Sequence, residues 1–142
     1  MNRLIIKTSE EKEILIEVVK VINLNPDANI GMIGELGAGK TSLLKSVLTR
    51  IDNNFAKQVS SPTFSYCNIY QEKIKVAHFD LYRLQSGADL IRIDLLEYLN
   101  SSLLVVIEWA DRFIDVLNEC NYLLEIAFEG KDKRVYTFKG IK

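Results

Sequence analysis

A single eight-residue segment constrains the fold of this chain more than any other feature. The segment is a complete phosphate-binding loop, Gly34-Glu35-Leu36-Gly37-Ala38-Gly39-Lys40-Thr41. The apolar run 30–33 precedes it, and apolar residues at helical spacing follow it between residues 43 and 51. A strand, a glycine loop and an amphipathic helix in this order are typical of nucleotide-binding α/β proteins. The sequence therefore predicts a phosphate-loop NTPase-like fold, with a mixed β-sheet flanked by helices.

The residue types in this loop explain what it would bind. Glycines let the backbone turn tightly, so that successive N–H groups and the N-terminus of the next helix can point at phosphate oxygens. We expect Lys40 to contact the β- and γ-phosphates and the Thr41 hydroxyl to bind magnesium. The predicted ligand is a nucleoside triphosphate with Mg²⁺. The residues expected to contact it here are Glu35, Leu36, Gly37, Ala38, Gly39, Lys40, Thr41 and Ser42.

Length and composition narrow the class of protein. The chain has 142 residues, 48% hydrophobic and 26% charged, which predicts one globular domain over residues 1–142. A net charge of −1 gives no basic surface for independent nucleic-acid binding. Without a signal peptide or a membrane-length apolar run, we expect a cytoplasmic protein. We interpret the basic group Lys131, Lys133 and Arg134 as a solvated hairpin tip, and the two cysteines as idle or buried thiols.

The remaining elements follow from apolar patterning. We expect a first strand at residues 4–6, followed by a helix capped by Thr8 or Ser9. Strands at 64–70 and 74–79 form one antiparallel hairpin, and strands at 122–128 and 134–138 form another. An interrupted helix is expected over 89–99. The unbroken apolar run 103–107 predicts a central strand that is buried on both faces.

Two carboxylates are candidates to hold magnesium or its water. Asp80 ends one expected strand and Glu108 ends another, and ligands of α/β sheets bind at the carboxyl ends of strands. Which of the two contacts the metal directly stays open. The segment 60–63 lies after the phosphate-binding helix, where nucleotide switches often supply a hydroxyl to the metal. Thr63 is the candidate, because Pro62 stiffens its presentation.

Four further residues have two interpretations each. His78 is either a packed core residue or a site residue beside Asp80. Trp109 either stacks near the nucleotide or fills the core. Arg83 and Arg112 either neutralise transition-state charge or form surface ion pairs. The chain has no Asn-Lys-x-Asp guanine-reading sequence, which favours ATP over GTP, and it is short for a nucleoside monophosphate kinase.

Four blocks together give the chain a specific resemblance. They are Gly34–Thr41, Ser61-Pro62-Thr63-Phe64, His78-Phe79-Asp80-Leu81-Tyr82-Arg83-Leu84 and Ile107-Glu108-Trp109-Ala110-Asp111-Arg112. In order and spacing they resemble the bacterial TsaE (YjeE) ATPases, over the stretch from the phosphate loop to about residue 112. The segment 85–94 diverges more, and the C-terminal hairpin is similar only in character.

The resemblance implies a role in making N6-threonylcarbamoyladenosine at position 37 of tRNA. ATP hydrolysis would accompany the TsaB–TsaD heterodimer, which carries out the transfer, and tRNA would be contacted only through that complex. It also implies site roles. Lys40 and Thr41 match phosphate and magnesium binding, Thr63 a switch threonine, and Trp109 a tryptophan beside the pocket. Asp80 and Glu108 match the acidic pair around magnesium and the attacking water.

These observations favour a magnesium-dependent ATPase that is slow alone, acting as an accessory subunit. Thr41 and Glu108 would hold magnesium, while Asp80 and Thr63 would orient water. Two alternatives stay open. One is a nucleotide-gated binding module whose ATP-bound form docks on a partner. The other is a small-molecule kinase, for which the chain offers little room.

Overall fold

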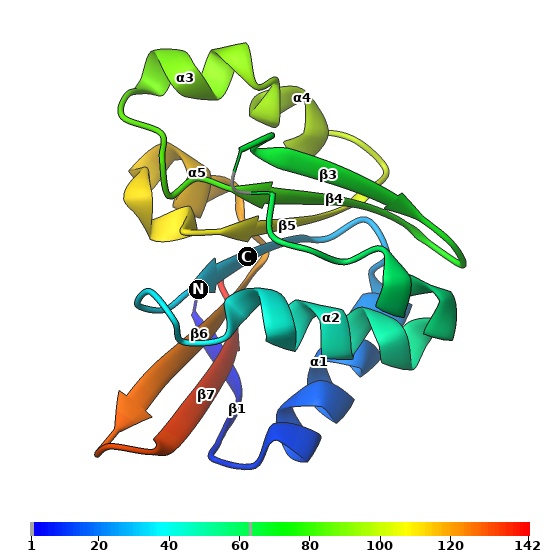
Figure 1. Ribbon diagram of the computed structural model, residues 1–142, viewed down its shortest axis with the longest axis vertical. Helices are drawn as coiled ribbons and strands as arrows, with labels where there is room; N and C mark the ends of the chain where they lie inside the picture. The colour runs from blue at the N-terminus through cyan, green and yellow to red at the C-terminus, as the bar shows by residue number, and fades with distance from the viewer. Residues whose placement is uncertain (1, 63) are drawn as a thin grey trace.

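A computed structural model describes residues 2–62 and 64–142 and shows one seven-stranded sheet with helices on both faces (Figure 1). The expected α/β fold, a mixed sheet with antiparallel hairpins, is confirmed. In chain order the elements are β1 (Arg3–Thr8), α1 (Glu11–Leu24), β2 (Asn29–Ile33), α2 (Lys40–Ile51), the 3-10 helix η1 (Asn53–Lys57), β3 (Cys67–Gln71), β4 (Lys75–Asp80), α3 (Gly87–Arg92), α4 (Leu95–Leu99), β5 (Leu104–Glu108), the 3-10 helix η2 (Ala110–Arg112), α5 (Ile114–Glu119), β6 (Tyr122–Glu129) and β7 (Lys133–Gly140).

The strand order is β1-β7-β6-β2-β5-β4-β3. The four strands β6, β2, β5 and β4 run parallel, and antiparallel pairs extend the sheet on both sides. Because β2, β4 and β5 are parallel neighbours, their carboxyl ends lie at the same edge. This edge carries the phosphate loop after β2, Asp80 at the end of β4 and Glu108 at the end of β5.

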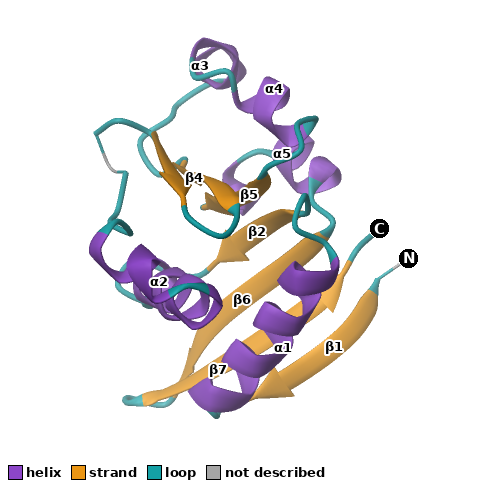
Figure 2. Cartoon of the chain, turned by 90° about the vertical axis from the view of Figure 1, so that its right-hand side faces the viewer, coloured by secondary structure: helices purple, strands orange, loops and turns teal. Residues whose placement is uncertain are grey.

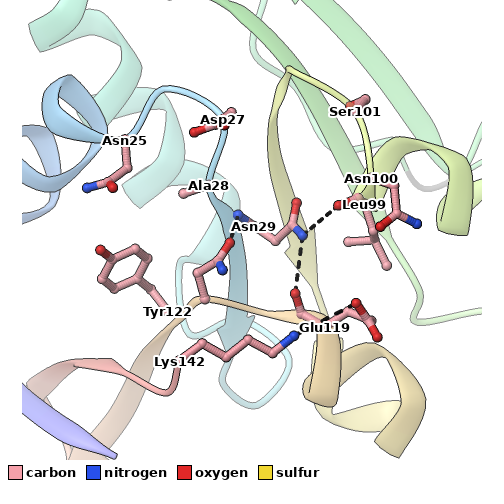
Figure 3. Close-up of a pocket in the computed structure, with 11 residues that line it drawn as sticks. Asn25, Asp27, Ala28, Asn29, Leu99, Asn100, Ser101, Glu119, Tyr122 and Lys142 are labelled. Atoms are coloured by element: carbon pink, nitrogen blue, oxygen red, sulfur yellow. Dashed lines mark hydrogen bonds and ion pairs between the residues drawn. The ribbon is translucent and has the colours of Figure 1, made fainter.

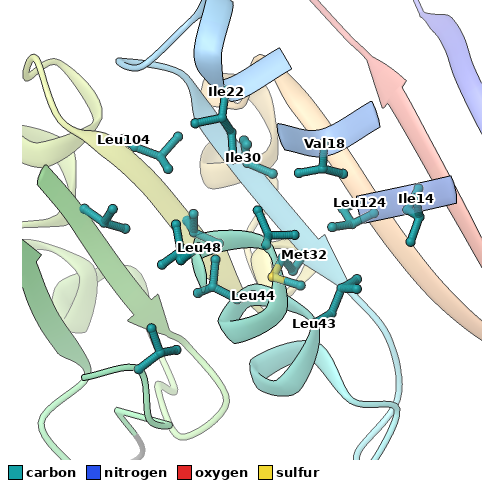
Figure 4. Packing of buried hydrophobic residues seen from close by; sticks show 14 of the residues in the cluster. Ile14, Val18, Ile22, Ile30, Met32, Leu43, Leu44, Leu48, Leu104 and Leu124 are labelled. Atoms are coloured by element: carbon teal, nitrogen blue, oxygen red, sulfur yellow. The ribbon is translucent and has the colours of Figure 1, made fainter. Parts of the chain in front are cut away.

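Two apolar clusters cover the two faces of the sheet. Alternation along β5 sends Leu104 and Val106 to one cluster and Val105 and Ile107 to the other, as expected for a strand buried on both faces. The helices α1 and α2 pack on the first face, where α1 crosses β6 and β7 (Figure 2). Figure 4 shows the apolar residues of these two helices facing Ile30 and Leu124 across the core. The helices α3, α4 and α5 cover the second face.

The structure corrects several expected boundaries. The N-cap of α1 is Glu10, because β1 extends to Thr8, whose Oγ1 instead accepts a bond from the Glu10 amide at 3.0 Å. The strand β3 begins only at Cys67, since residues 64–66 form a turn in which Tyr66 has φ 64°. The expected break in the helix over 89–99 is confirmed, and it falls at Asp94, which has φ 59°. Among the described residues, no helix has the length and apolar character needed to cross a membrane.

Candidate functional site

The phosphate loop connects β2 to α2 and turns at two glycines. Gly37 and Gly39 have φ 80° and 100°, in the left-handed region where a side chain would be strained. Gly39 is the N-cap of α2, so the twelve-residue helix begins with Lys40 and directs its first amides at the concave side of the loop. The side chain of Glu35 and that of Leu36 are exposed at the loop tip.

Lys40 is folded back against its own loop. Its side chain is 5% exposed, and Nζ donates to the carbonyl oxygens of Gly34 at 2.5 Å and Glu35 at 3.1 Å. Nζ also lies 4.1 Å from the centroid of the Trp109 ring, a cation–π contact. Burial lowers the pKa of this amine, although the charges of Glu108 and Asp80 oppose that shift. The amine of Lys40 therefore has two loop carbonyls and the Trp109 ring as partners.

The two candidate carboxylates lie side by side. Asp80 and Glu108 are register partners on β4 and β5, and they are 7% and 3% exposed. The hydroxyl of Thr41 donates to Glu108 Oε2 at 2.7 Å. Asp80 accepts bonds from the amide of Tyr82 at 2.9 Å and the hydroxyl of Ser61 at 3.5 Å. Burial raises the pKa of Asp80, and the neighbouring charge of Glu108 adds to the rise.

The donor set fits magnesium. Two carboxylates and a hydroxyl offer hard oxygen atoms, which Mg²⁺ prefers. Within residues 2–62 and 64–142, no group of three or more His, Cys, Asp or Glu side chains is arranged so that it could hold a metal ion. Magnesium sites that rely on one or two carboxylates are typically completed by substrate phosphates and water. The site therefore suits magnesium that arrives with a nucleotide.

His78 has features of both of its interpretations, a buried position in the sheet and a contact with the acidic pair. The ring is fully buried, and Nε2 lies 2.5 Å from Glu108 Oε2. On the other side Nδ1 lies 2.8 Å from the Tyr70 hydroxyl. Each ring nitrogen therefore has one polar partner. His78 thus contacts the candidate acidic pair directly.

Trp109 lies at the wall of the site. It has φ 61°, an unusual conformation for a bulky residue, and its amide donates to Met32 O at 3.1 Å. The centroid of the Tyr82 ring lies 4.9 Å from that of the Trp109 ring, and Lys40 Nζ also contacts the Trp109 ring. Together these groups enclose a hollow of ≈ 320 Å³. Its lining consists of Leu36, Gly37, Gly39, Lys40, Thr41, Ser42, Ser61, Asp80, Tyr82, Glu108 and Trp109.

Two sequence candidates, Arg83 and Arg112, are not brought to the hollow. The Arg83 guanidinium lies 4.8 Å from the Phe64 ring, and Arg112 Nε donates to Leu84 O at 2.5 Å. Among the residues that the structure describes, neither arginine has an ion-pair partner. Thr63 lies outside the described residues, so its expected switch role stays a prediction.

Arg134 contacts the phosphate loop, which the sequence did not indicate. Its Nε donates to the carbonyl of Ala38 in the phosphate loop at 2.8 Å, across 96 positions of sequence. The interpretation of Lys131, Lys133 and Arg134 as a solvated hairpin tip is confirmed, since all three are exposed at the turn between β6 and β7. The turn itself covers only residues 130–132, so Arg134 belongs to β7. No local pattern signals a contact that depends on the strand order of the whole sheet.

A second hollow, of ≈ 450 Å³, lies at the opposite ends of the parallel strands, where β2 and β6 begin (Figure 3). Its central side chain, Asn29, donates through Nδ2 to Leu99 O at 2.9 Å and Glu119 O at 3.2 Å. The Asn29 amide donates to Asn121 Oδ1 at 2.7 Å. These bonds fasten the ends of α4 and α5 to β2, so the buried amide here has a structural role.

Comparisons with known proteins agree with this geometry. The model of the family described as "Threonylcarbamoyl adenosine biosynthesis protein TsaE" matches residues 6–136. The "tRNA threonylcarbamoyladenosine biosynthesis protein TsaE" of Haemophilus influenzae is 34% identical over 96 residues, 67% of this chain and 60% of that protein. The protein of the same name from Aquifex aeolicus is 30% identical over 135 residues, 94% of this chain and 92% of that protein.

The extent of these matches differs. This chain spans 60% of the length of the Haemophilus relative and 61% of the Rickettsia prowazekii relative, which is 32% identical over 90 residues. The crystal structure of Bacillus subtilis YdiB has a TM-score of 0.61 at 20% identity and covers 100% of this chain and 88% of that chain, so it shows a shared fold. The match of the family model over residues 6–136 means that the chain belongs to the TsaE family.

Proposed function

We propose that this protein is a magnesium-dependent ATPase that serves tRNA threonylcarbamoyladenosine biosynthesis. The observation that carries the proposal is the convergence of Lys40, Thr41, Asp80 and Glu108 on one hollow. A phosphate loop alone would support nucleotide binding. The two buried carboxylates beside its threonine add what hydrolysis requires, a place to hold magnesium and a group to orient water.

Each residue has a distinct task in this proposal. Lys40 releases the carbonyls of its own loop and neutralises phosphate charge. Thr41 and Glu108 would hold magnesium, which when bound neutralises charge on the phosphate oxygens. Asp80, with Thr63 as a further candidate, orients the attacking water. Trp109 closes the wall against solvent.

Slow hydrolysis by the isolated chain is part of the proposal. Among the described arginines, Arg83 and Arg112 have contacts away from the hollow, and Arg134 contacts the loop backbone. An arginine beside the transferred phosphate accelerates hydrolysis by about 10³- to 10⁵-fold in other NTPases. A partner protein could supply such a group or order the site. The partner we propose is the TsaB–TsaD heterodimer, with tRNA contacted only through that complex.

The test is ATP hydrolysis by the purified chain, with and without TsaB–TsaD from the same organism. We expect slow hydrolysis alone and clear stimulation by the complex. Loss of both activities in Glu108→Gln would support the assignment of the site. An unchanged rate with the complex would refute the partner, and a wild-type chain that releases no phosphate would refute the activity.

The same absence of an arginine at the hollow favours one alternative, a nucleotide-gated binding module. In that case ATP binding controls docking, and hydrolysis is incidental. A Glu108→Gln variant that binds ATP and still supports repeated modification cycles would favour the module over the ATPase. Phosphate transfer to a small molecule would instead indicate a kinase.

A further inference from the structure

A line of buried polar groups extends from Glu108 away from the nucleotide hollow. His78 lies two residues before Asp80 on β4, so both side chains project from the same face of the sheet. Its Nε2 meets Glu108 Oε2 at 2.5 Å, the oxygen that also accepts the Thr41 hydroxyl at 2.7 Å. On the next strand, β3, Tyr70 places its hydroxyl 2.8 Å from His78 Nδ1.

The line ends on the backbone of Ser60. The Tyr70 hydroxyl donates to Ser60 O at 3.0 Å and accepts from Ser60 N at 3.3 Å. Asn68 Nδ2 donates to the same carbonyl at 3.1 Å and to the same hydroxyl at 3.4 Å. The next residue, Ser61, contacts Asp80. Thus one chain of contacts joins the first turn of α2 to the segment 59–62, which lies between η1 and the turn before β3.

Three features separate this line from an ordinary packed histidine. The His78 ring is fully buried, both of its nitrogens have polar partners, and one partner is the carboxylate beside the phosphate loop. A buried network whose members are all satisfied has one preferred arrangement, because breaking any bond leaves a polar group without a partner. Thr41 and His78 share one oxygen of Glu108, so a ligand that takes over the Thr41 hydroxyl leaves His78 as the remaining partner of that oxygen.

We propose that His78 and Tyr70 are positioning residues that hold Glu108 in its working orientation and transmit nucleotide occupancy to residues 59–62. The inference rests on the proposed function, because it assigns the coupling within that same site. Neither residue touches the nucleotide in this scheme. His78 fixes one oxygen of Glu108, and Tyr70 ties that histidine to the Ser60 backbone.

A matched pair of substitutions isolates the bond to Glu108. Glutamine can place its amide nitrogen near the position of Nε2, whereas asparagine reaches only the position of Nδ1. We expect His78→Gln to keep most of the hydrolysis rate. His78→Asn and Tyr70→Phe should lower kcat about 10- to 100-fold, the usual cost of losing a residue that positions a metal ligand. Their affinity for ADP in the absence of magnesium should stay within about threefold of the wild-type affinity. The matched control is Val106→Ala, since Val106 is the register partner of His78 and is buried but apolar.

Hydrogen exchange provides a readout other than activity. In the wild type, magnesium with a non-hydrolysable ATP analogue should slow exchange of the Ser60 amide and its neighbours in 59–62. This slowing should persist in Val106→Ala and be lost in His78→Asn and Tyr70→Phe. It should also be lost in His78→Gln, because glutamine keeps the bond to Glu108 but not the contact with Tyr70. Circular dichroism and thermal unfolding of each variant verify the fold.

The outcomes distinguish this inference from the proposed function. If His78→Asn retains both the rate and the slowed exchange, the coupling is wrong while the ATPase assignment stands. If Val106→Ala loses them equally, the effect is general destabilisation and the inference is also wrong. If the wild-type chain takes no nucleotide, the proposed function fails and the inference fails with it.

Discussion

Replacing Lys40 by alanine tests the nucleotide site most directly. The amine has three partners within the protein, two loop carbonyls at 2.5 and 3.1 Å and the Trp109 ring at 4.1 Å. ATP binding therefore exchanges contacts and does not simply add them. The affinity that the lysine contributes is the difference between its phosphate contacts and the contacts it gives up.

The magnitude of this difference can be worked out. Two charge-assisted bonds to phosphate contribute about 6 kcal/mol at the upper end of the usual range. The amine gives up two carbonyl bonds of about 1.5 kcal/mol each, the lower end of that range, and a ring contact of about 0.5 to 1 kcal/mol. The net contribution is about 2 to 2.5 kcal/mol. We therefore expect Lys40→Ala to weaken ATP binding roughly 30- to 70-fold.

Calorimetry with ATP and magnesium measures the loss. The matched control is Lys45→Ala, which removes an exposed lysine five residues further along the same helix, α2, and should leave affinity unchanged. Trp109 is the only tryptophan, so its fluorescence should also change when the amine leaves its ring on ATP binding. Affinity of Lys40→Ala within threefold of the wild type, or an equal loss in Lys45→Ala, would refute the exchange argument.

Three further predictions concern chemistry, titration and packing. Glu108→Gln should keep ATP affinity but lower hydrolysis about 10- to 100-fold, because the neutral amide is a poor metal ligand; phosphate release and calorimetry measure the two effects. Burial raises the pKa of the Cys67 thiol from 9.0 to about 11 and that of the Cys120 thiol to about 12. At pH 8 a thiol reagent should therefore label Cys67 about 100-fold more slowly in the folded than in the denatured protein, and it should label Cys120 only on unfolding. The folded state keeps protons that the unfolded chain loses, so the free energy of unfolding should fall as pH rises from about 9 toward 12, as denaturation at stepped pH would show. Gly31→Ala puts a Cβ 2.8 Å from a leucine side chain of β6 and should cost about 1 to 3 kcal/mol of stability, whereas Gly87→Ala, with open space around it, should be neutral or stabilising in the same urea titration.

The sequence predicted best where a local pattern has one physical solution. The apolar run ending at Ile107 could only be a strand covered on both faces, and β5 is that strand. The glycine loop between a strand and a helix was equally specific. The sequence pattern did not indicate α5, because this six-residue helix buries only Val116 within its span and so has no periodic apolar stripe.

The site was predictable as a set of residue types but less so as a network. Strand ends indicated that Asp80 and Glu108 would meet, and they are register partners. The bonds of Arg134 to the phosphate loop and of His78 to Glu108 depend on which strands are neighbours, and spacing along the chain carries no such information. Such contacts follow from topology, so they become visible only once the strand order is known.

The acidic pair also has a consequence for stability. Two carboxylates at 7% and 3% exposure lie on adjacent strands, and burial together with mutual repulsion raises the pKa of Asp80. A chain selected only for stability would place apolar or neutral groups at these positions. The fold instead offsets the cost with specific partners: Thr41 and His78 for Glu108, and the Tyr82 amide for Asp80. Both carboxylates line the hollow beside the phosphate loop, so the fold bears this cost where the proposed chemistry lies.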